Sequence, residues 1–597
     1  MPMILHSASP YTVDIPNPAL GYLKGFLKRR GIDVHNIYWN LVLYREINNF
    51  NKDVEHIHSL SVDAVTVYTW KQLAGYSAIT TPLDYIFQSV LTKDELCELV
   101  QSVKDKIDKF ITEKRLHEAD IAGFTMKTYQ WLMNSYIMSR LEEMNPDMKI
   151  VIGGISTEDQ GRALMRMVTK ADFAIWGEGE YPLVHLIQSL EDNNTLQDVP
   201  NLIYRDGNNL FSTTPLREYP PLDEYPFADH SDYFDAVTRF MPANMQVLIP
   251  VWGSRSCPWN KCKFCVLNEE YSYRTRSPEN IVEEIEYQSQ KHGTYTFIFV
   301  DTEIAGNKKR LKTLLTLLVK ASSRRKEPYH FFAEISPVFI DKETAKLMQV
   351  ASFTSIQVGF EAMTDSLLEK MEKRHTFAHN IQALKLGNQY GLYIDGLNII
   401  RGTPPETKED ILESCKNVKF VRFLLNKYVF RPGSLELYKG SPFYEEMPEE
   451  ERKSWRYHRF WEEIAPLNLI PEEDRFEFFG FFKKKPDFVW DDFESVRRAL
   501  EEQNRSYTWI EYEDGSFIEE KGPGIYKYVL DRDETDILVF CDLIKSFSEV
   551  KKQFSHIKED NLRELLSSLK DFGLIYYDKN MHTIISVLEA CRRNQTF

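Results

Sequence analysis

The chain has 597 residues, 43% of them hydrophobic and 13% aromatic, so it is too long for one compact core and too apolar to be disordered. Its formal charge of −16 argues against a nucleic-acid binder that depends on neutralising phosphates. No uncharged apolar run approaches the roughly 18 residues of a membrane span, and the start lacks a basic segment followed by an apolar one. We therefore expect a multidomain cytoplasmic protein without nucleic-acid or membrane partners.

Residues 1–215 alternate short apolar runs with helical segments. The runs that we expect to be strands are 3–6, 34–38, 120–124 and 149–152. This alternation predicts an α/β fold with a doubly wound, Rossmann-like parallel sheet. Residues 41–118 are mainly helical in pattern and are expected to form an insertion in this domain.

A second α/β series follows a proline-rich passage, which places a linker at residues 216–245 and a domain at residues 246–437. Ser277 is a good N-cap and Pro278 suits the first helical position after it. Six βα units suggest an open barrel whose ligands lie at the carboxyl ends of the strands. The six strand candidates are 246–251, 295–300, 329–334, 355–358, 393–400 and 427–431.

The remainder, residues 438–597, is more charged and aromatic and is expected to form an α+β C-terminal domain. Its last part, residues 534–587, predicts three short helices followed by a hairpin at 574–577 and 583–585, which is winged-helix-like. Because the chain is acidic, we interpret this module as a unit for peptide recognition or for packing, rather than for reading DNA.

Three of the seven cysteines, Cys257, Cys262 and Cys265, fall within nine residues directly after the first barrel strand. Three thiolates can hold three corners of a four-iron cluster and leave one iron open, whereas zinc usually takes a fourth protein ligand. An iron–sulfur cluster, a zinc site with a distant fourth ligand, and coincidence therefore all stay open on spacing alone. The scattered cysteines, Cys97, Cys415, Cys541 and Cys591, are expected to be small buried hydrophobes.

A three-cysteine loop after the first strand of a six-unit barrel resembles the radical S-adenosylmethionine (SAM) superfamily. The resemblance implies a [4Fe–4S] cluster whose open iron binds SAM, and an electron that splits SAM to give a 5′-deoxyadenosyl radical. The usual spacing is CxxxCxxC, and this chain has CxxxxCxxC, one residue longer. The SAM contacts that the resemblance implies, beside the cysteines and at the strand ends, are Phe264, Asp301, Glu303, Glu334, Gln357, Glu361, Asn398 and Ile400.

The N-terminal domain resembles the cobalamin-binding domain that precedes many such barrels. Glycines at strand ends let the backbone approach a bulky ligand and offer N–H donors to its nucleotide tail. The contacts implied are Asn17, Pro18, Gly21, Thr125, Met126, Gly153, Gly154, Gly177, Glu178 and Gly179. A DxHxxG motif is missing: His35 follows Asp33 and Val34, but no glycine comes after it, so we expect a strand histidine and leave the lower cobalt ligand unassigned.

Within the superfamily, residues 262–268, 273–279 and 441–444 are most similar to enzymes that mature ribosomally made peptides, including C-methyltransferases. This implies transfer of a methyl group from cobalamin to an unactivated carbon of a precursor peptide or a protein. An external flavodoxin- or ferredoxin-like protein would donate the electron. The alternatives are a cobalamin-binding radical SAM peptide cyclase or rearrangement enzyme, and a non-catalytic, zinc-stabilised adaptor that binds peptides.

Overall fold

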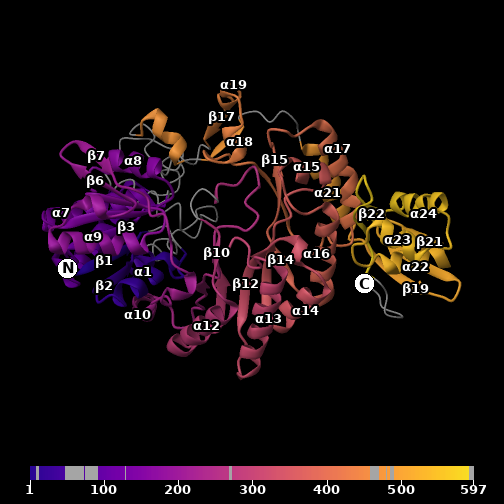
Figure 1. Cartoon of the computed structure of the whole chain (residues 1–597), viewed down its shortest axis with the longest axis horizontal. Helices are drawn as coiled ribbons and strands as arrows, with labels where there is room; N and C mark the ends of the chain where they lie inside the picture. The colour runs from indigo at the N-terminus through magenta and orange to yellow at the C-terminus, as the bar shows by residue number, and fades with distance from the viewer. Residues whose placement is uncertain are drawn as a thin grey trace.

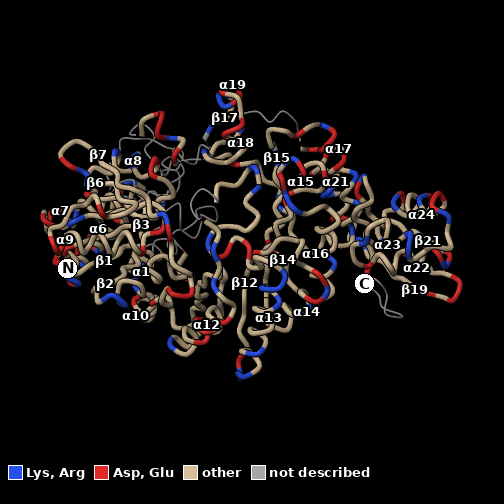
Figure 2. The backbone as a smooth tube through the Cα atoms, in the orientation of Figure 1, with Lys and Arg blue, Asp and Glu red and all other residues tan. Residues whose placement is uncertain are grey.

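The computed structural model describes residues 1–8, 12–46, 73, 92–127, 130–267, 272–457, 470–478, 480–483 and 490–589. Much of the insertion expected at 41–118, and also Asn268 and Cys591, lie outside these residues. Along the long axis of the molecule the N-terminal region, the central region and residues 506–589 follow one another, whereas residues 442–457 lie back between the first two (Figure 1). Acidic and basic residues are spread over all of them (Figure 2). None of the described helices is long and apolar enough to cross a membrane.

The N-terminal region is a seven-stranded sheet with the order β2-β1-β3-β4-β5-β6-β7. Its first five strands are parallel, which confirms the expected Rossmann-like sheet. The last two add an antiparallel hairpin at one edge, which the sequence did not indicate. The strands are β1 (Met3–Ser7), β2 (Val34–Tyr38), β3 (Ile121–Thr125), β4 (Lys149–Ile155), β5 (Phe173–Trp176), β6 (Leu202–Asp206) and β7 (Asn209–Ser212).

Helices cover this sheet, and local signals in the sequence explain where they begin. The side chain of Asn17 accepts a hydrogen bond from the Ala19 N–H at 3.1 Å, and Pro18 opens the helix that follows. Thr157 caps a second helix in the same way. The helices are α1 (Pro18–Lys28), α2 (Trp39–Val42), α6 (Lys93–Glu113), α7 (Trp131–Met144), α8 (Glu158–Met167), α9 (Glu180–Asp192) and, in the linker, α10 (Ser231–Phe240).

The central region has six consecutive parallel strand segments, as expected for an open barrel. Five of its strands form one sheet with the order β14-β13-β12-β11-β8. Gly396, with φ of +63°, divides the fifth segment, and its second half pairs with the sixth strand. The strands are β8 (Ile249–Val251), β11 (Thr296–Phe299), β12 (His330–Ile335), β13 (Phe353–Val358), β14 (Tyr393–Asp395), β15 (Leu397–Arg401) and β16 (Phe430–Ser434).

The barrel helices alternate with these strands and include the one predicted from its cap. Ser277 accepts a hydrogen bond from the Asn280 N–H at 3.2 Å, Pro278 follows in the first position, and Gly293 ends the helix with φ of +67°. The helices are α12 (Pro278–His292), α13 (Lys308–Ser323), α14 (Lys342–Val350), α15 (Asp365–Lys370), α16 (Phe377–Tyr390) and α17 (Lys408–Asn417).

The C-terminal region contains the expected three helices and hairpin, preceded by a three-stranded antiparallel sheet that the sequence analysis did not anticipate. Its helices are α18 (Pro442–Glu445), α19 (Glu449–Arg452), α21 (Asp491–Glu502), α22 (Arg532–Phe540), α23 (Phe547–Gln553) and α24 (Glu559–Asp571). Its strands are β17 (Trp455–Tyr457), β18 (Phe481–Lys483), β19 (Ser506–Glu511), β20 (Gly515–Lys521), β21 (Ile525–Asp531), β22 (Ile575–Tyr577) and β23 (Ile584–Ser586).

Candidate active site

The three cysteines lie in one loop that follows β8. Two short antiparallel strands, β9 (Ser254–Arg255) and β10 (Arg274–Thr275), close the loop at its base. Ser256 takes a left-handed backbone conformation, with φ of 64°, which a residue other than glycine rarely adopts. The Cys265 N–H donates to the Cys262 carbonyl at 3.1 Å and makes a tight turn. Strained backbone of this kind is concentrated at ligand sites.

The thiols of Cys257, Cys262 and Cys265 are half-buried and lie close enough to repel one another when ionised. Burial raises the pKa of Cys262 to about 11, while the nearby charge of Lys373 acts to lower it. No three His, Cys, Asp or Glu side chains of the described residues converge closely enough to hold a single metal ion. Three thiolates on one loop suit a [4Fe–4S] cluster, in which each thiolate binds a different iron.

Two of the carboxylates expected to contact SAM are already paired within the protein. Asp301 is buried at the end of β11 and accepts hydrogen bonds from the Gly253 N–H, at 2.8 Å, and from the Ser254 hydroxyl. Glu303 is also buried, and its carboxylate receives Arg374 at 2.9 Å. Burial raises the pKa of both carboxyls. Asp301 therefore anchors the start of the cysteine loop.

A second pair of carboxylates lies at the neighbouring strand ends, and one of them, Glu361, lies near the cysteines. Glu334, at the end of β12, has no hydrogen-bond or ion-pair partner among the described residues, and burial together with the charge of Glu361 raises its pKa. Glu361 forms an ion pair with Lys373 at 3.1 Å. The Lys373 ammonium lies 5.5 Å from the ring centroid of Phe264, which immediately precedes Cys265. The unpaired Glu334 carboxylate and the Lys373 ammonium, which lies near Cys262, carry charges opposite to the two charges of an amino-acid zwitterion such as that of SAM.

The other expected SAM contacts are spread along the neighbouring strands. Gln357 on β13 is half-buried and packs beside Gly396. Ile400 on β15 is half-buried, whereas Asn398 on the same strand is exposed. Lys373, which lies nearer to the cysteines, was missed by the sequence analysis. The chain around it, Lys373–Arg374–His375, follows no spacing that would have indicated it.

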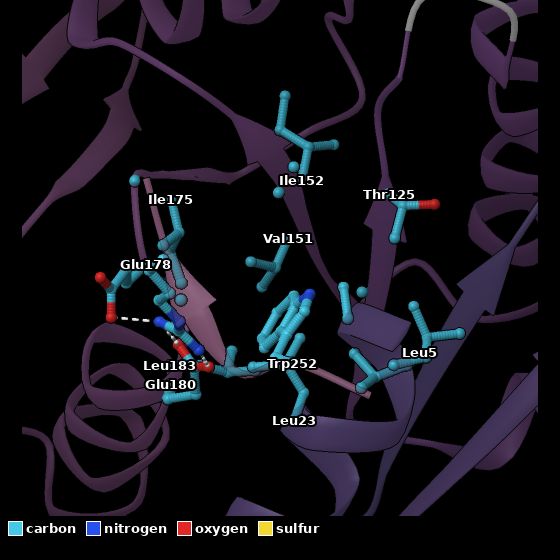
Figure 3. Close-up of a pocket in the computed structure, with 18 of the residues that line it drawn as sticks. Leu5, Leu23, Thr125, Val151, Ile152, Ile175, Glu178, Glu180, Leu183 and Trp252 are labelled. Atoms are coloured by element: carbon cyan, nitrogen blue, oxygen red, sulfur yellow. Dashed lines mark hydrogen bonds and ion pairs between the residues drawn. The ribbon is translucent and has the colours of Figure 1, made fainter. Parts of the chain in front are cut away.

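A cavity of about 250 Å³ lies between the N-terminal sheet and the cysteine loop. A space of this size is far larger than the roughly 15 Å³ that one water needs, so it is not a packing defect. Trp252, directly after β8, lies in its wall near Val151 and Leu23 (Figure 3). Ser256 and Leu267 of the cysteine loop and Thr302 beyond β11 also line it.

Six of the residues expected to contact cobalamin line this cavity: Thr125, Gly153, Gly154, Gly177, Glu178 and Gly179. A Cβ added at Gly153 would meet no atom within 4 Å, and Gly154 and Gly177 take positive φ values of 75° and 72°. These glycines leave open space in which a large flat ligand can contact the backbone. The largely aliphatic lining, which the sequence analysis did not identify, includes Leu5, Leu20, Leu23, Val151, Ile152, Ile175 and Leu183.

Four other expected cobalamin contacts have structural partners away from the cavity lining. Asn17 caps α1 and Pro18 opens it. Gly21 is needed because α1 packs on His230: an added Cβ would lie 2.3 Å from its ring. The Met126 sulfur accepts a hydrogen bond from Asn134 at 3.2 Å.

The described lining of the cavity contains no histidine or cysteine. His35 lies on β2 with its side chain 66% exposed, in agreement with its interpretation as a strand histidine. His6 on β1 is buried, stacks on Phe124 with ring centroids 4.4 Å apart, and accepts a hydrogen bond from the indole of Trp39 at 3.0 Å. The described wall of the cavity is therefore largely apolar and contains no imidazole.

The central region resembles a known protein family. The family model of the radical SAM superfamily matches residues 253–418. The anaerobic magnesium-protoporphyrin IX monomethyl ester cyclase of Cereibacter sphaeroides is 27% identical over 317 residues, which cover 52% of this chain and 50% of the cyclase. The uncharacterized methyltransferase PH0819 of Pyrococcus horikoshii is 25% identical over 305 residues, which cover 51% of this chain and 64% of that protein. The match thus spans only part of these curated relatives.

A solved structure extends the likeness to the N-terminal sheet. The radical SAM methyltransferase TsrM from Kitasatospora setae, determined with cobalamin and a [4Fe–4S] cluster bound, has a TM-score of 0.55 and 16% sequence identity, and the match covers 83% of this chain and 90% of TsrM. At that identity the likeness concerns the fold. Residues 253–418 thus match the radical SAM superfamily, and the fold of the chain is like that of a methyltransferase structure solved with cobalamin and a [4Fe–4S] cluster bound.

Proposed function

We propose that this enzyme uses a [4Fe–4S] cluster, SAM and cobalamin to methylate a carbon atom of a peptide. The observation that carries the proposal is the shared cavity. Gly153 and Gly154 of the sheet line one side, and Ser256 and Thr302, on the cysteine loop and beside it, line the other. Radical transfer requires reacting groups to be held together away from water, and a cavity enclosed by both domains provides this.

Each group of side chains has a distinct part in this proposal. Held at Cys257, Cys262 and Cys265, a cluster with SAM would supply hydrogen-atom abstraction, and cobalamin in the cavity would supply the methyl group. Glu334 and Lys373 orient the amino-acid end of SAM. The aliphatic lining of the cavity excludes water. The electron comes from outside the chain, from a flavodoxin- or ferredoxin-like donor.

An exposed sheet edge in the C-terminal domain supports a peptide substrate. In the described structure β21 pairs with β20 along one side only. Its side chains include Ile525, 64% exposed, Tyr526, 47% exposed, and Val529, 81% exposed. Unpaired backbone groups with apolar side chains beside them are the surface on which an extended peptide adds as a further strand. A ribosomal precursor peptide would meet this requirement, as would an extended segment of a larger protein.

The proposal is tested by anaerobic purification, analysis of iron, sulfide and cobalt, and incubation of a candidate peptide with SAM that carries a trideuterated methyl group. We expect a product heavier by that methyl group, together with 5′-deoxyadenosine. Cys262→Ala should remove the cluster and both products, whereas Cys97→Ala, at an exposed position on α6, should change neither. Survival of iron content and SAM cleavage in Cys262→Ala would disprove the assigned cluster site.

Cyclisation is the second candidate, because three relatives are cyclases. The same labelled incubation separates the two reactions. A cyclised or rearranged peptide gains no deuterium, whereas a methylated one does.

A further inference from the structure

One carboxylate connects the cavity to the cysteine loop. Glu178 lies in the turn between β5 and α9, and only 4% of the residue is exposed. Its two oxygens accept hydrogen bonds from Arg255 and Arg274, one each. Arg255 also pairs with Glu180, the first residue of α9 (Figure 3). Both oxygens of Glu178 are therefore paired with arginines.

The two arginines stand at the two ends of the loop that carries the cysteines. Arg255 on β9 is the direct cross-strand neighbour of Arg274 on β10. Like charges in such positions repel, and the carboxylates of Glu178 and Glu180 balance them. Arg255 also lies 4.7 Å over the ring of Trp252 in the cavity wall, and Arg274 lies 4.7 Å over the ring of Tyr219 in the linker region. Both ends of the loop are thus fixed to one turn of the N-terminal sheet.

The same turn forms part of the cavity wall, through Gly177 and Gly179 on either side of Glu178. A ligand bound against this turn restrains the position of Glu178. Through its hydrogen bonds, Glu178 in turn restrains Arg255 and Arg274. We propose that Glu178 is a positioning residue that couples the two sites, so that cobalamin in the cavity and a cluster in the loop each raise the affinity for the other. This inference rests on the proposed function. Such coupling is reciprocal and typically amounts to about 5- to 150-fold in affinity.

The test measures binding of hydroxocobalamin to the full-length protein by equilibrium dialysis, with the cluster reconstituted and without iron. In the wild type we expect the Kd to be at least about fivefold lower when the cluster is present. In Glu178→Gln the ratio of the Kd without the cluster to the Kd with it should fall to about one. The neutral amide has a single acceptor oxygen and no negative charge, so it cannot pair with both arginines. The matched control is Glu520→Gln, which neutralises a buried carboxylate paired with Arg422 at 2.9 Å in the C-terminal region. It should keep the wild-type ratio.

Two outcomes would overturn the inference: a wild-type Kd that does not respond to the cluster, or an undiminished response in Glu178→Gln. Should the single variant fail to fold, Glu178→Gln combined with Arg274→Gln removes one charge of each sign and leaves Arg255 paired with Glu180. The Kd of this double variant for hydroxocobalamin should likewise not change when the cluster is present. A Kd that still falls with the cluster would contradict the inference. Wild-type protein that binds no cobalamin, or forms no cluster, would reject the proposed function itself and the inference with it.

Discussion

At the scale of single residues, the structure separates carboxylates that are paired within the protein from one that is not. Asp301 and Glu303 are satisfied by groups far away in the sequence, such as the Gly253 N–H and Arg374. Glu334 has no such partner in the described structure. The sequence placed all three at strand ends but could not distinguish them, because their partners come from other strands and loops. For the same reason it could not reveal Lys373.

A substitution at Gly153 tests the cavity. Because an added side chain there meets no atom within 4 Å, Gly153→Val should project into the cavity without displacing the protein around it. We expect hydroxocobalamin to bind at least about tenfold more weakly, a loss of about 1.4 kcal/mol, while the thermal unfolding midpoint stays nearly unchanged. Dialysis and thermal unfolding measure the two quantities.

The matched control is Gly524→Val. A side chain added at Gly524 also meets no atom within 4 Å. This position lies beside β21, far along the chain from the residues that line the cavity. Its cobalamin affinity should equal that of the wild type. If Gly153→Val binds cobalamin normally and remains folded, the ligand does not occupy the space in front of β4.

At the scale of elements, regular βα alternation made most strands predictable. Residues 34–38 coincide with β2, and residues 295–300 contain β11 (Thr296–Phe299). The sixth barrel strand was placed at 427–431 but is Phe430–Ser434, because Pro432 and Gly433 obscure its pattern. The strands β9 and β10 have two residues each, too few for any periodicity to show. Their pairing depends on Glu178 and Glu180, which belong to another domain.

The sheet β19–β21 was predictable in principle but was missed. Its first strand, β19, alternates Tyr507 and Trp509 with Ser506 and Thr508, and Gly515 and Gly524 lie at the turns of the sheet. The sequence analysis described residues 438–597 as charged and aromatic and placed no strands in the segment that forms β19–β21. The exposed apolar side chains of β21 depart from this alternation, which is the reason to assign them a binding role.

Val529→Lys tests that role. Since Val529 is 81% exposed, the substitution should change the free energy of unfolding by no more than about 0.5 kcal/mol. A peptide strand added to β21 would meet the new charge, so its Kd should rise at least about tenfold, as measured by fluorescence anisotropy of a labelled precursor peptide. Val350→Lys, at a 50% exposed position on α14, is the control and should bind like the wild type. Equal binding by Val529→Lys would place the peptide elsewhere.

At the scale of the whole molecule, the order of the domains was predictable, but the way they meet was not. The junction depends on contacts that no local pattern indicates. Tyr22 on α1 donates a hydrogen bond to Glu284 on α12 at 3.0 Å, and its ring stacks on Trp252 with centroids 4.6 Å apart. These contacts hold the sheet against the barrel and leave the cavity between them. The shared cavity is therefore a property of the assembled domains, and only the structure could provide it.

The free energy of unfolding of the assembled molecule should decrease at acidic pH because of its buried histidines. His6 and His230 are fully buried, and burial lowers the pKa of each to about 3. An imidazole in the unfolded chain has a pKa of about 6.5, so between these values the unfolded state binds more protons than the folded state. The contribution of each histidine to the free energy of unfolding is therefore fully present above about pH 6.5 and is lost as the pH falls below that value. At pH 5 the loss is about 2 kcal/mol for each histidine.

We therefore expect the urea midpoint to fall between about pH 7 and pH 5, and to fall less steeply in His6→Phe. The phenyl ring can keep the stacking on Phe124, although it loses the hydrogen bond from Trp39, so the variant should be less stable at neutral pH and yet less sensitive to acid. His35→Phe, on the exposed face of β2, should retain the wild-type slope. A slope in His6→Phe equal to that of the wild type would show that His6 takes up its proton without unfolding, through a local opening of β1 and Trp39.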